Sequence, residues 1–333
     1  MRSLLFNLHF IMVLFLFSCT SKTDNSSIAK TITVDKGGNG GFSSVQRAID
    51  SVPSNKKEWT LISVKSGIYN EKVVVPEDKP FIILVGESIK KTLIQWGDHG
   101  SSNLSATFTL RADNFVAMNL SFVNTYNLDT PDLDDRNTIL WAPAATIYGD
   151  KASFYLCGFV GVQDTLTDAL GRHFFVSCYI QGTIDFIWGK GQSVYKNCVF
   201  NATTGMLGGR AGYITAQGRA NSNDPSGFVF LSGFIYSTGP VYLGRAYNQY
   251  SRVVFKNTYM SIVVQPKGWS SWGFVGKEAD IVYSEVSCLG PGAKMSQRVK
   301  WEKKLLTEDL KKLTDLNKFI NEDGWIQGQP RLK

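Results

Sequence analysis

The sequence predicts an all-β protein with the fold of a right-handed parallel β-helix, with an N-terminal capping helix and a C-terminal helical tail. Three observations predict it: a repeat of about 20 residues, short apolar segments separated by turn residues, and helical spacing only near the two ends. One coil of such a fold cannot bury a core by itself, so like positions must stack on successive coils.

Three cysteines mark the repeat. Cys157, Cys178 and Cys198 stand in FYLCGF, FVSCYI and YKNCVF, at steps of 21 and 20 residues. The same pattern without cysteine occurs upstream in AMNLSF and downstream in FKNTYM. Alternating apolar residues between Gly, Asn and Asp turns favour strands over helices. Stacked coils would place the three cysteines in an internal ladder with a spacing of about 4.8 Å.

The cysteines outside the leader are Cys157, Cys178, Cys198 and Cys288. We expect them to be small buried apolar residues, with disulfides as the alternative. A catalytic thiol has less support because none has a nearby histidine to lower its pKa. So few cysteines do not make a disulfide-dense scaffold, and the core must come from packing.

Both ends of the repeat region carry helical patterns. The segment FSSVQRAIDSVP, residues 42–53, has apolar residues at helical spacing and would cap the N-terminal end of the coils. The segment LTEDLKKLTDLNKFI, residues 306–320, has an acidic first turn and would pack outside the coils. The polar insertion at 124–143 is expected to be a surface loop near the site. We expect a single domain over residues 23–333.

The first 22 residues are interpreted as a secretory signal peptide, because Arg2 precedes an apolar run from Leu4 to Phe17 and a polar exit. A membrane anchor is the alternative, but the run is shorter than the roughly 20 residues that span a bilayer. A bacterial lipoprotein signal fits less well, and no later segment predicts a membrane span. Secretion would make four sequons meaningful, at Asn25, Asn103, Asn119 and Asn201.

The chain is basic, with a formal net charge of +7. Such a charge suits a polyanionic partner. For a secreted protein we expect an acidic polysaccharide rather than nucleic acid, and we expect the protein to be a monomer.

Two aspartates, Asp164 and Asp185, are also 21 residues apart. If one coil has that length, they are neighbours on one face. Two adjacent carboxyl groups do not ionise equally, so one can serve as an acid and the other as a base or nucleophile. The alternative is that each aspartate only caps backbone amides in a turn, which suits Asp185 least because its neighbours are apolar.

Other chemistries have less support in the residue inventory. Outside the leader the only histidines are His99 and His173, and there is no G-x-S-x-G elbow, metal-spaced His or Cys pair, P-loop or dinucleotide fingerprint. A Ser-His-Asp hydrolase and a zinc enzyme are therefore disfavoured.

Five segments carry a family resemblance: GIYNEKV from Gly67, GVQDTLTD from Gly161, GTIDFIWGKG from Gly182, ITAQGR from Ile214 and YLGRAY from Tyr242. With these motifs in this order, the chain resembles the plant-type pectinesterases (pectin methylesterases) from about Thr31 to Trp325. It is similar to their short form, which has no N-terminal inhibitor-like pro-region. The fold that the resemblance implies is also a right-handed parallel β-helix.

The resemblance implies roles for four residues. Asp185 matches the nucleophile that attacks the methyl ester of galacturonate, and Asp164 matches the general acid and base. Arg245 matches the arginine that keeps the nucleophile ionised, and Gln163 matches a donor to the oxyanion. The implied substrate is methyl-esterified homogalacturonan, the implied products are pectate and methanol, and no metal or organic cofactor is implied. A proteinaceous pectinesterase inhibitor is a further implied partner.

Substrate contacts are expected from aromatic and basic side chains. Phe186 and Tyr247 match aromatic positions of the family's cleft, although the family commonly has Trp at the second. Trp269 and Trp272 could stack on sugar rings or only pack within the fold. Arg219 and Lys190 could meet free galacturonate carboxylates or simply be solvated. These side chains would form the walls of the cleft.

The chain departs from the family pattern at Trp141, which stands where the family has a second oxyanion glutamine. An indole offers one N–H donor in place of an amide. The main hypothesis is therefore a secreted pectinesterase, and the alternative is a catalytically impaired pectin-binding relative. A β-helical polygalacturonase or lyase fits less well, because the motifs around the two aspartates match the esterases.

Overall fold

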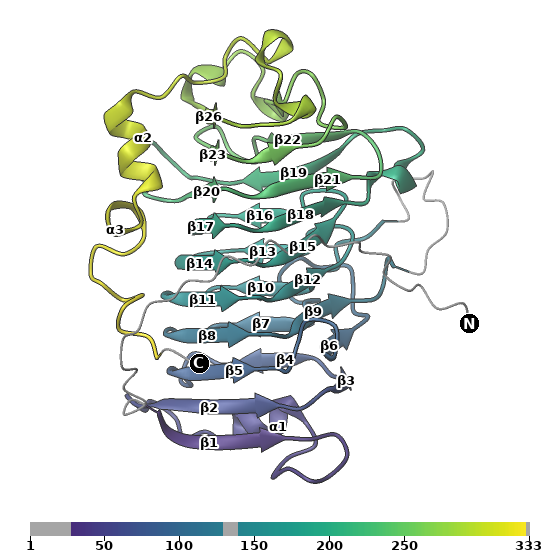
Figure 1. Ribbon diagram of the computed structural model, residues 1–333, viewed down its shortest axis with the longest axis vertical. Coiled ribbons are helices and arrows are strands. Elements are labelled where there is room, and N and C mark those ends of the chain that lie inside the picture. Colours follow the sequence, from purple (N-terminus) through teal and green to yellow (C-terminus); the bar gives the residue numbers. More distant parts are fainter. Residues whose placement is uncertain (1–27, 129–138, 331–333) are drawn as a thin grey trace.

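The computed structural model describes residues 28–128 and 139–330. These residues form a stack of coils in which three parallel sheets run along one axis (Figure 1). The predicted parallel β-helix is confirmed. The expected signal peptide, the sequon at Asn25 and residues 129–138 of the expected loop at 124–143 lie outside the described residues.

Each sheet takes one strand from each of several coils, in chain order. Sheet A contains β1 (Ile28–Val34), β2 (Trp59–Val64), β5 (Ile82–Val85), β8 (Phe115–Met118), β11 (Ala152–Tyr155), β14 (Arg172–Val176), β17 (Gln192–Lys196), β20 (Gly227–Leu231), β23 (Arg252–Lys256) and β26 (Val282–Val286). Sheet B contains β3 (Gly67–Asn70), β6 (Thr92–Trp96), β9 (Ser121–Asn124), β12 (Gly158–Val160), β15 (Tyr179–Gly182), β18 (Val199–Ala202), β21 (Phe234–Ser237) and β24 (Tyr259–Met260).

Sheet C contains β4 (Val73–Val75), β7 (Phe108–Leu110), β10 (Ala145–Ile147), β13 (Leu166–Asp168), β16 (Ile187–Gly189), β19 (Gly212–Gln217), β22 (Val241–Arg245) and β25 (Trp269–Ser270). Short 3-10 turns, η2 (Thr204–Leu207), η3 (Trp272–Phe274), η4 (Glu278–Asp280), η5 (Pro291–Ala293) and η6 (Met295–Gln297), interrupt the later connections. Sheet C follows sheet B within each coil, so the turns between B and C lie on one side of the stack.

The register of sheet A reproduces the repeat read from the sequence. Ala152 pairs with His173, and His173 pairs with Ser193, at steps of 21 and 20 residues. The inward side chains of the same strands stack as aromatic rungs: the centroid distance is 4.9 Å from Phe154 to Phe175 and 4.6 Å from Phe175 to Tyr195. Offset stacking of this kind adds about 1 kcal/mol per pair to the burial of apolar area. The core is therefore a continuous column rather than a set of separate clusters.

The cysteine ladder lies at the turn from sheet A to sheet B. Cys157, Cys178 and Cys198 are buried free thiols, and Cys288 is a half-buried free thiol. The thiol of Cys178 contacts the carbonyl oxygen of Phe154 at 3.3 Å. The expectation that the three ladder cysteines are small buried residues rather than disulfides is confirmed.

Helices lie near both ends of the described chain. Helix α1 (Val45–Asp50) begins at Ser44, whose side chain accepts a hydrogen bond from the backbone N–H of Arg47, and it lies beside β1 and β2 (Figure 1). At the other end, the expected helix at 306–320 is divided into α2 (Thr307–Thr314) and α3 (Leu316–Phe319). Asp315 separates them because its side chain caps the N-terminus of α3.

The tail packs on the outer face of sheet A. Leu313, Phe319, Ile320 and Trp325 of the tail form one buried cluster with side chains of β14, β17, β20 and β23. No helix within residues 28–128 and 139–330 is long and apolar enough to cross a membrane.

Candidate active site

The two aspartates lie in consecutive turns between sheets B and C. Asp164 follows β12 and Asp185 follows β15. Gln163 forms a parallel bridge with Ile184, and the backbone N–H of Asp164 donates to the carbonyl oxygen of Ile184 at 3.1 Å. The interval of 21 residues is thus one coil, and it makes the two aspartates adjacent. Their φ angles are 58° and 49°, a left-handed conformation that aspartate tolerates better than most residues.

Arg245 reaches the second aspartate from the end of β22. Its Nε donates to Asp185 Oδ1 at 2.7 Å and its Nη2 donates to Oδ2, so the pair is bidentate. Strand β19 lies between β22 and β16 in sheet C, and the long arginine side chain spans that strand. The guanidinium group also lies over two rings, at 4.0 Å from the centroid of Trp272 and 4.5 Å from that of Tyr213. These contacts fix the guanidinium plane opposite the carboxylate.

Burial and charge act differently on the pKa values of the two carboxyl groups. Burial raises the pKa of Asp164 to about 8, the negative charge of Asp185 adds to the rise, and a hydrogen bond from Ser102 offsets part of it. Burial also raises the pKa of Asp185, but the charge and hydrogen bonds of Arg245 oppose the rise and favour the carboxylate. At neutral pH Asp164 therefore holds a proton beside an arginine-bound Asp185.

Ser102 is a site residue that sequence reasoning missed. Its Oγ donates to Asp164 Oδ2 at 2.6 Å, across 62 positions of the chain. The loop that carries it is held by two contacts: Gly100 donates its N–H to the Trp141 carbonyl oxygen, and Thr146 Oγ1 donates to the Ser102 carbonyl oxygen. Nothing in the segment GSSN distinguishes this serine in the sequence, since it stands in neither a strand nor the repeat.

Gln163 and Trp141 are brought together beside the pair. The side-chain amide of Gln163 has hydrogen-bond partners at both its oxygen and its nitrogen in only one orientation. In that orientation Oε1 accepts from Trp141 Nε1 at 3.1 Å, and Nε2 donates to the Ile139 carbonyl oxygen at 3.3 Å. The oxygen and nitrogen of an amide are distinguished by such partners. The site thus contains a nucleophile candidate, an acid candidate and an amide donor from two consecutive turns, together with a guanidinium group from the end of β22.

The chain is similar to known proteins over most of its length. The family model named Pectinesterase matches residues 31–325. The chain belongs to the pectinesterase family. It is 47% identical over 300 residues to probable pectinesterase 29 of Arabidopsis thaliana, covering 90% of this chain and 89% of that protein, and 47% identical to probable pectinesterase 55 of the same plant, covering 90% and 91%.

Among solved structures, pectin methylesterase from carrot is similar with a TM-score of 0.82 and 27% identity, covering 95% of this chain and 98% of that one. As a pectinesterase, the chain is a carboxylic ester hydrolase. The described residues contain no group of three or more His, Cys, Asp or Glu side chains that could hold a metal ion.

Two of the expected aromatic contacts lie at the surface of this pectinesterase. Tyr247 is 43% exposed and Trp272 is 49% exposed, and their ring centroids are 6.0 Å apart. The ring centroid of Trp188 lies 5.5 Å from that of Tyr247. Because Trp272 also contacts Arg245, this aromatic group borders the two aspartates with exposed ring faces.

Other expected contacts do not reach the surface. Phe186 and Trp269 have exposed fractions of 0% and 1%, so both belong to the core and neither presents a face to substrate. Arg219 is also buried, and its Nε donates to the Asp224 carbonyl oxygen at 2.7 Å. Its guanidinium group holds the loop at 220–226 instead of meeting a carboxylate of the substrate. Lys190 is exposed.

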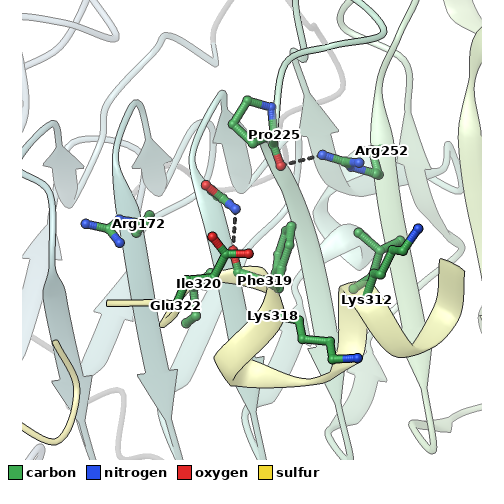
Figure 2. A pocket seen from close by; sticks show the side chains of 10 residues that line it. Arg172, Pro225, Arg252, Lys312, Lys318, Phe319, Ile320 and Glu322 are labelled. Atoms are coloured by element: carbon green, nitrogen blue, oxygen red, sulfur yellow. Dashed lines mark hydrogen bonds between the residues drawn. The ribbon is translucent and has the colours of Figure 1, made fainter. Parts of the chain in front are cut away.

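A cavity of about 400 Å³ lies away from the aspartates, between the tail helices and the outer face of sheet A (Figure 2). Three of the polar side chains that line it have partners within the chain. Arg172 pairs with Asp150 and Asp323, Arg252 donates to the Pro225 carbonyl oxygen, and Gln192 donates to that of Phe319. The cavity therefore results from the packing of the tail, and neither Asp164 nor Asp185 lines it.

Proposed function

We propose that this pectinesterase hydrolyses the methyl esters of homogalacturonan through a covalent acyl-enzyme on Asp185, with Asp164 as general acid and then general base. One observation carries the proposal. The Arg245 guanidinium group binds Asp185 through two hydrogen bonds, while the neighbouring Asp164 has its pKa raised to about 8. Two carboxyl groups in different protonation states are what acid-assisted nucleophilic catalysis requires.

In the first step, a carboxylate oxygen of Asp185 attacks the ester carbonyl carbon, and the carbonyl oxygen becomes an oxyanion. The Gln163 amide donates a hydrogen bond to that oxyanion. The intermediate collapses by breaking the bond between the acyl carbon and the methoxy oxygen. Asp164 gives its proton to the departing oxygen, so methanol leaves and an anhydride joins the galacturonate to Asp185.

In the second step, Asp164 is an anion and can accept a proton. It takes one from a water molecule, whose oxygen attacks the galacturonate acyl carbon. The bond to Asp185 breaks, so the carboxylic acid group of galacturonic acid leaves, with Asp185 as a carboxylate and Asp164 protonated again; the released acid then gives its proton to solvent. Atoms and charges balance over the cycle without a metal or organic cofactor. Arg245 serves in both steps, because its charge makes the Asp185 carboxylate a stable leaving group.

The same proposal includes a location and partners. A signal peptide over residues 1–22 would direct the protein to the cell wall, where its net charge of +7 suits the acidic polysaccharide. Tyr247 and Trp272 would stack on sugar rings beside the pair. The hypothesis also includes a proteinaceous inhibitor that covers the same cleft. It further includes a monomeric state of the protein.

The test is methanol release from highly methylated pectin by the purified protein, beside Asp185→Ala. We expect the variant to lose at least about 1000-fold in rate. Equal background rates for both proteins, with pectin binding retained, would contradict the proposal. They would support the second candidate, a pectin-binding relative, which is motivated by Trp141 at the position of a family glutamine. Recovery of activity in Trp141→Gln would then assign the loss to the missing amide.

A further inference from the structure

We infer that Trp141 is a positioning residue that fixes the side-chain amide of Gln163, so that one hydrogen of Nε2 is left to bind the oxyanion. The inference rests on the proposed function for its catalytic consequence. The hydrogen bond from the indole to the amide stands independently of it. This role differs from the one expected of a direct replacement for a second glutamine.

The side chain of Trp141 can donate one hydrogen bond. An indole has a single N–H donor and no acceptor. The indole N–H of Trp141 is directed at Gln163 Oε1, with a distance of 3.1 Å from Nε1. A donor that is used in this way is not available to an oxyanion at the same time. Trp141 therefore influences the reaction through Gln163 rather than by contact with the reacting atoms.

The second step concerns the amide itself. Nε2 carries two hydrogens, and one of them is donated to the Ile139 carbonyl oxygen at 3.3 Å. In the opposite orientation Oε1 would face that carbonyl and Nε2 would face the indole N–H, so both ends would lack a partner. The two contacts thus select one orientation, in which the second hydrogen of Nε2 remains free.

The third step is the rigidity of the two anchors. Ile139 is 4% exposed and packs in a small apolar cluster with Val162 and Leu207. The backbone of Trp141 is fixed as well, because its carbonyl oxygen accepts from the N–H of Gly100 at 2.8 Å. A donor held in advance needs no reorganisation when the oxyanion forms, which is the condition for strong stabilisation.

A double-mutant cycle tests the inference. Trp141→Phe keeps an aromatic ring but removes the N–H donor, and we expect kcat to fall about fivefold with KM little changed, which corresponds to one neutral hydrogen bond. Gln163→Ala should lower kcat by about 100-fold or more. In the Gln163→Ala background, Trp141→Phe should cause no further loss. An equal loss in both backgrounds would overturn the inference, because Trp141 would then act without Gln163.

A second readout does not depend on turnover. The Trp141 indole N–H should exchange with solvent slowly, and its exchange should be about fivefold or more faster in Gln163→Ala. Exchange that is the same with and without Gln163 would overturn the inference even in an inactive protein. Loss of methanol release alone, with the exchange effect intact, would reject only the proposed function. Trp96→Phe, at a half-exposed tryptophan on β6, is the matched control and should change neither readout.

Discussion

Replacing Asp164 by asparagine should abolish methanol release and stabilise the fold. Asp164 is 6% exposed, and its pKa is about 8 instead of 3.8. Between these two values the native protein must keep a proton that the unfolded chain releases. Stability therefore falls as the pH rises through this range. Asparagine removes that penalty, can still accept from Ser102 through its carbonyl oxygen, and tolerates the left-handed backbone.

The size of the gain follows from the same pKa. In the unfolded chain the carboxyl group of Asp164 has its ordinary pKa, and pH 7 lies about 3 units above that value. Each unit corresponds to about 1.4 kcal/mol, so Asp164→Asn should raise the free energy of unfolding at pH 7 by on the order of 4 kcal/mol. At pH 5 the gain should be only about 1.5 kcal/mol by the same relation. Above about pH 8 the difference should stop growing, because both states are then ionised.

Urea unfolding of wild type and Asp164→Asn at pH 5, 6, 7 and 8 measures this difference directly. Asp224→Asn is the control of opposite sign. Its carboxylate accepts from the N–H groups of Ala220 and Ser226, which lower its pKa, so the variant should lose about 1 to 2 kcal/mol. A difference between wild type and Asp164→Asn that does not change with pH would refute the raised pKa.

Three further outcomes are expected. Ser102→Ala removes a hydrogen bond that lowers the pKa of Asp164, so the alkaline limb of kcat/KM should move to higher pH; an unchanged limb would contradict the contact. Arg245→Lys keeps the charge but loses the bidentate fork, so kcat/KM should fall about 10-fold to 100-fold, and full activity would show that charge alone suffices. The ladder thiols at Cys157, Cys178 and Cys198 should react with a thiol reagent only after unfolding, and rapid reaction in the native protein would place them outside the core.

The fold and the adjacency of the two aspartates were predictable because both follow from the length of one coil. Residues one repeat apart must be neighbours in a parallel stack, so the interval of 21 residues between Asp164 and Asp185 specified a contact. The same reasoning predicted the buried cysteine ladder. The repeat did not predict that Arg245 pairs with Asp185; only the family resemblance did. Arg245 lies 60 residues from Asp185, and its strand β22 is separated in sheet C from β16, the strand after Asp185, by β19.

Contacts made by turns were not predictable in this way. Phe186 was expected at the surface but follows Asp185, whose left-handed φ changes the direction of the chain, and its ring enters the core. Trp269 lies in β25 and packs on Tyr283, with ring centroids 4.5 Å apart. Ser102 comes from the loop between β6 and β7, outside the repeating strands. The direction of a side chain at a turn depends on the φ and ψ angles of the turn, and the spacing of the sequence repeat does not specify these angles.

The most direct test of the central claim is a search for the covalent intermediate on Asp185. Wild type would be mixed with a methylated galacturonan oligomer, quenched in acid within the first turnover, digested and analysed by mass spectrometry. The account predicts a galacturonyl adduct on the peptide that contains Asp185, its loss in Asp185→Ala, and a first burst of methanol close to one per protein molecule. Steady methanol release by Asp185→Ala at a rate near that of wild type, with no adduct in either protein, would contradict it.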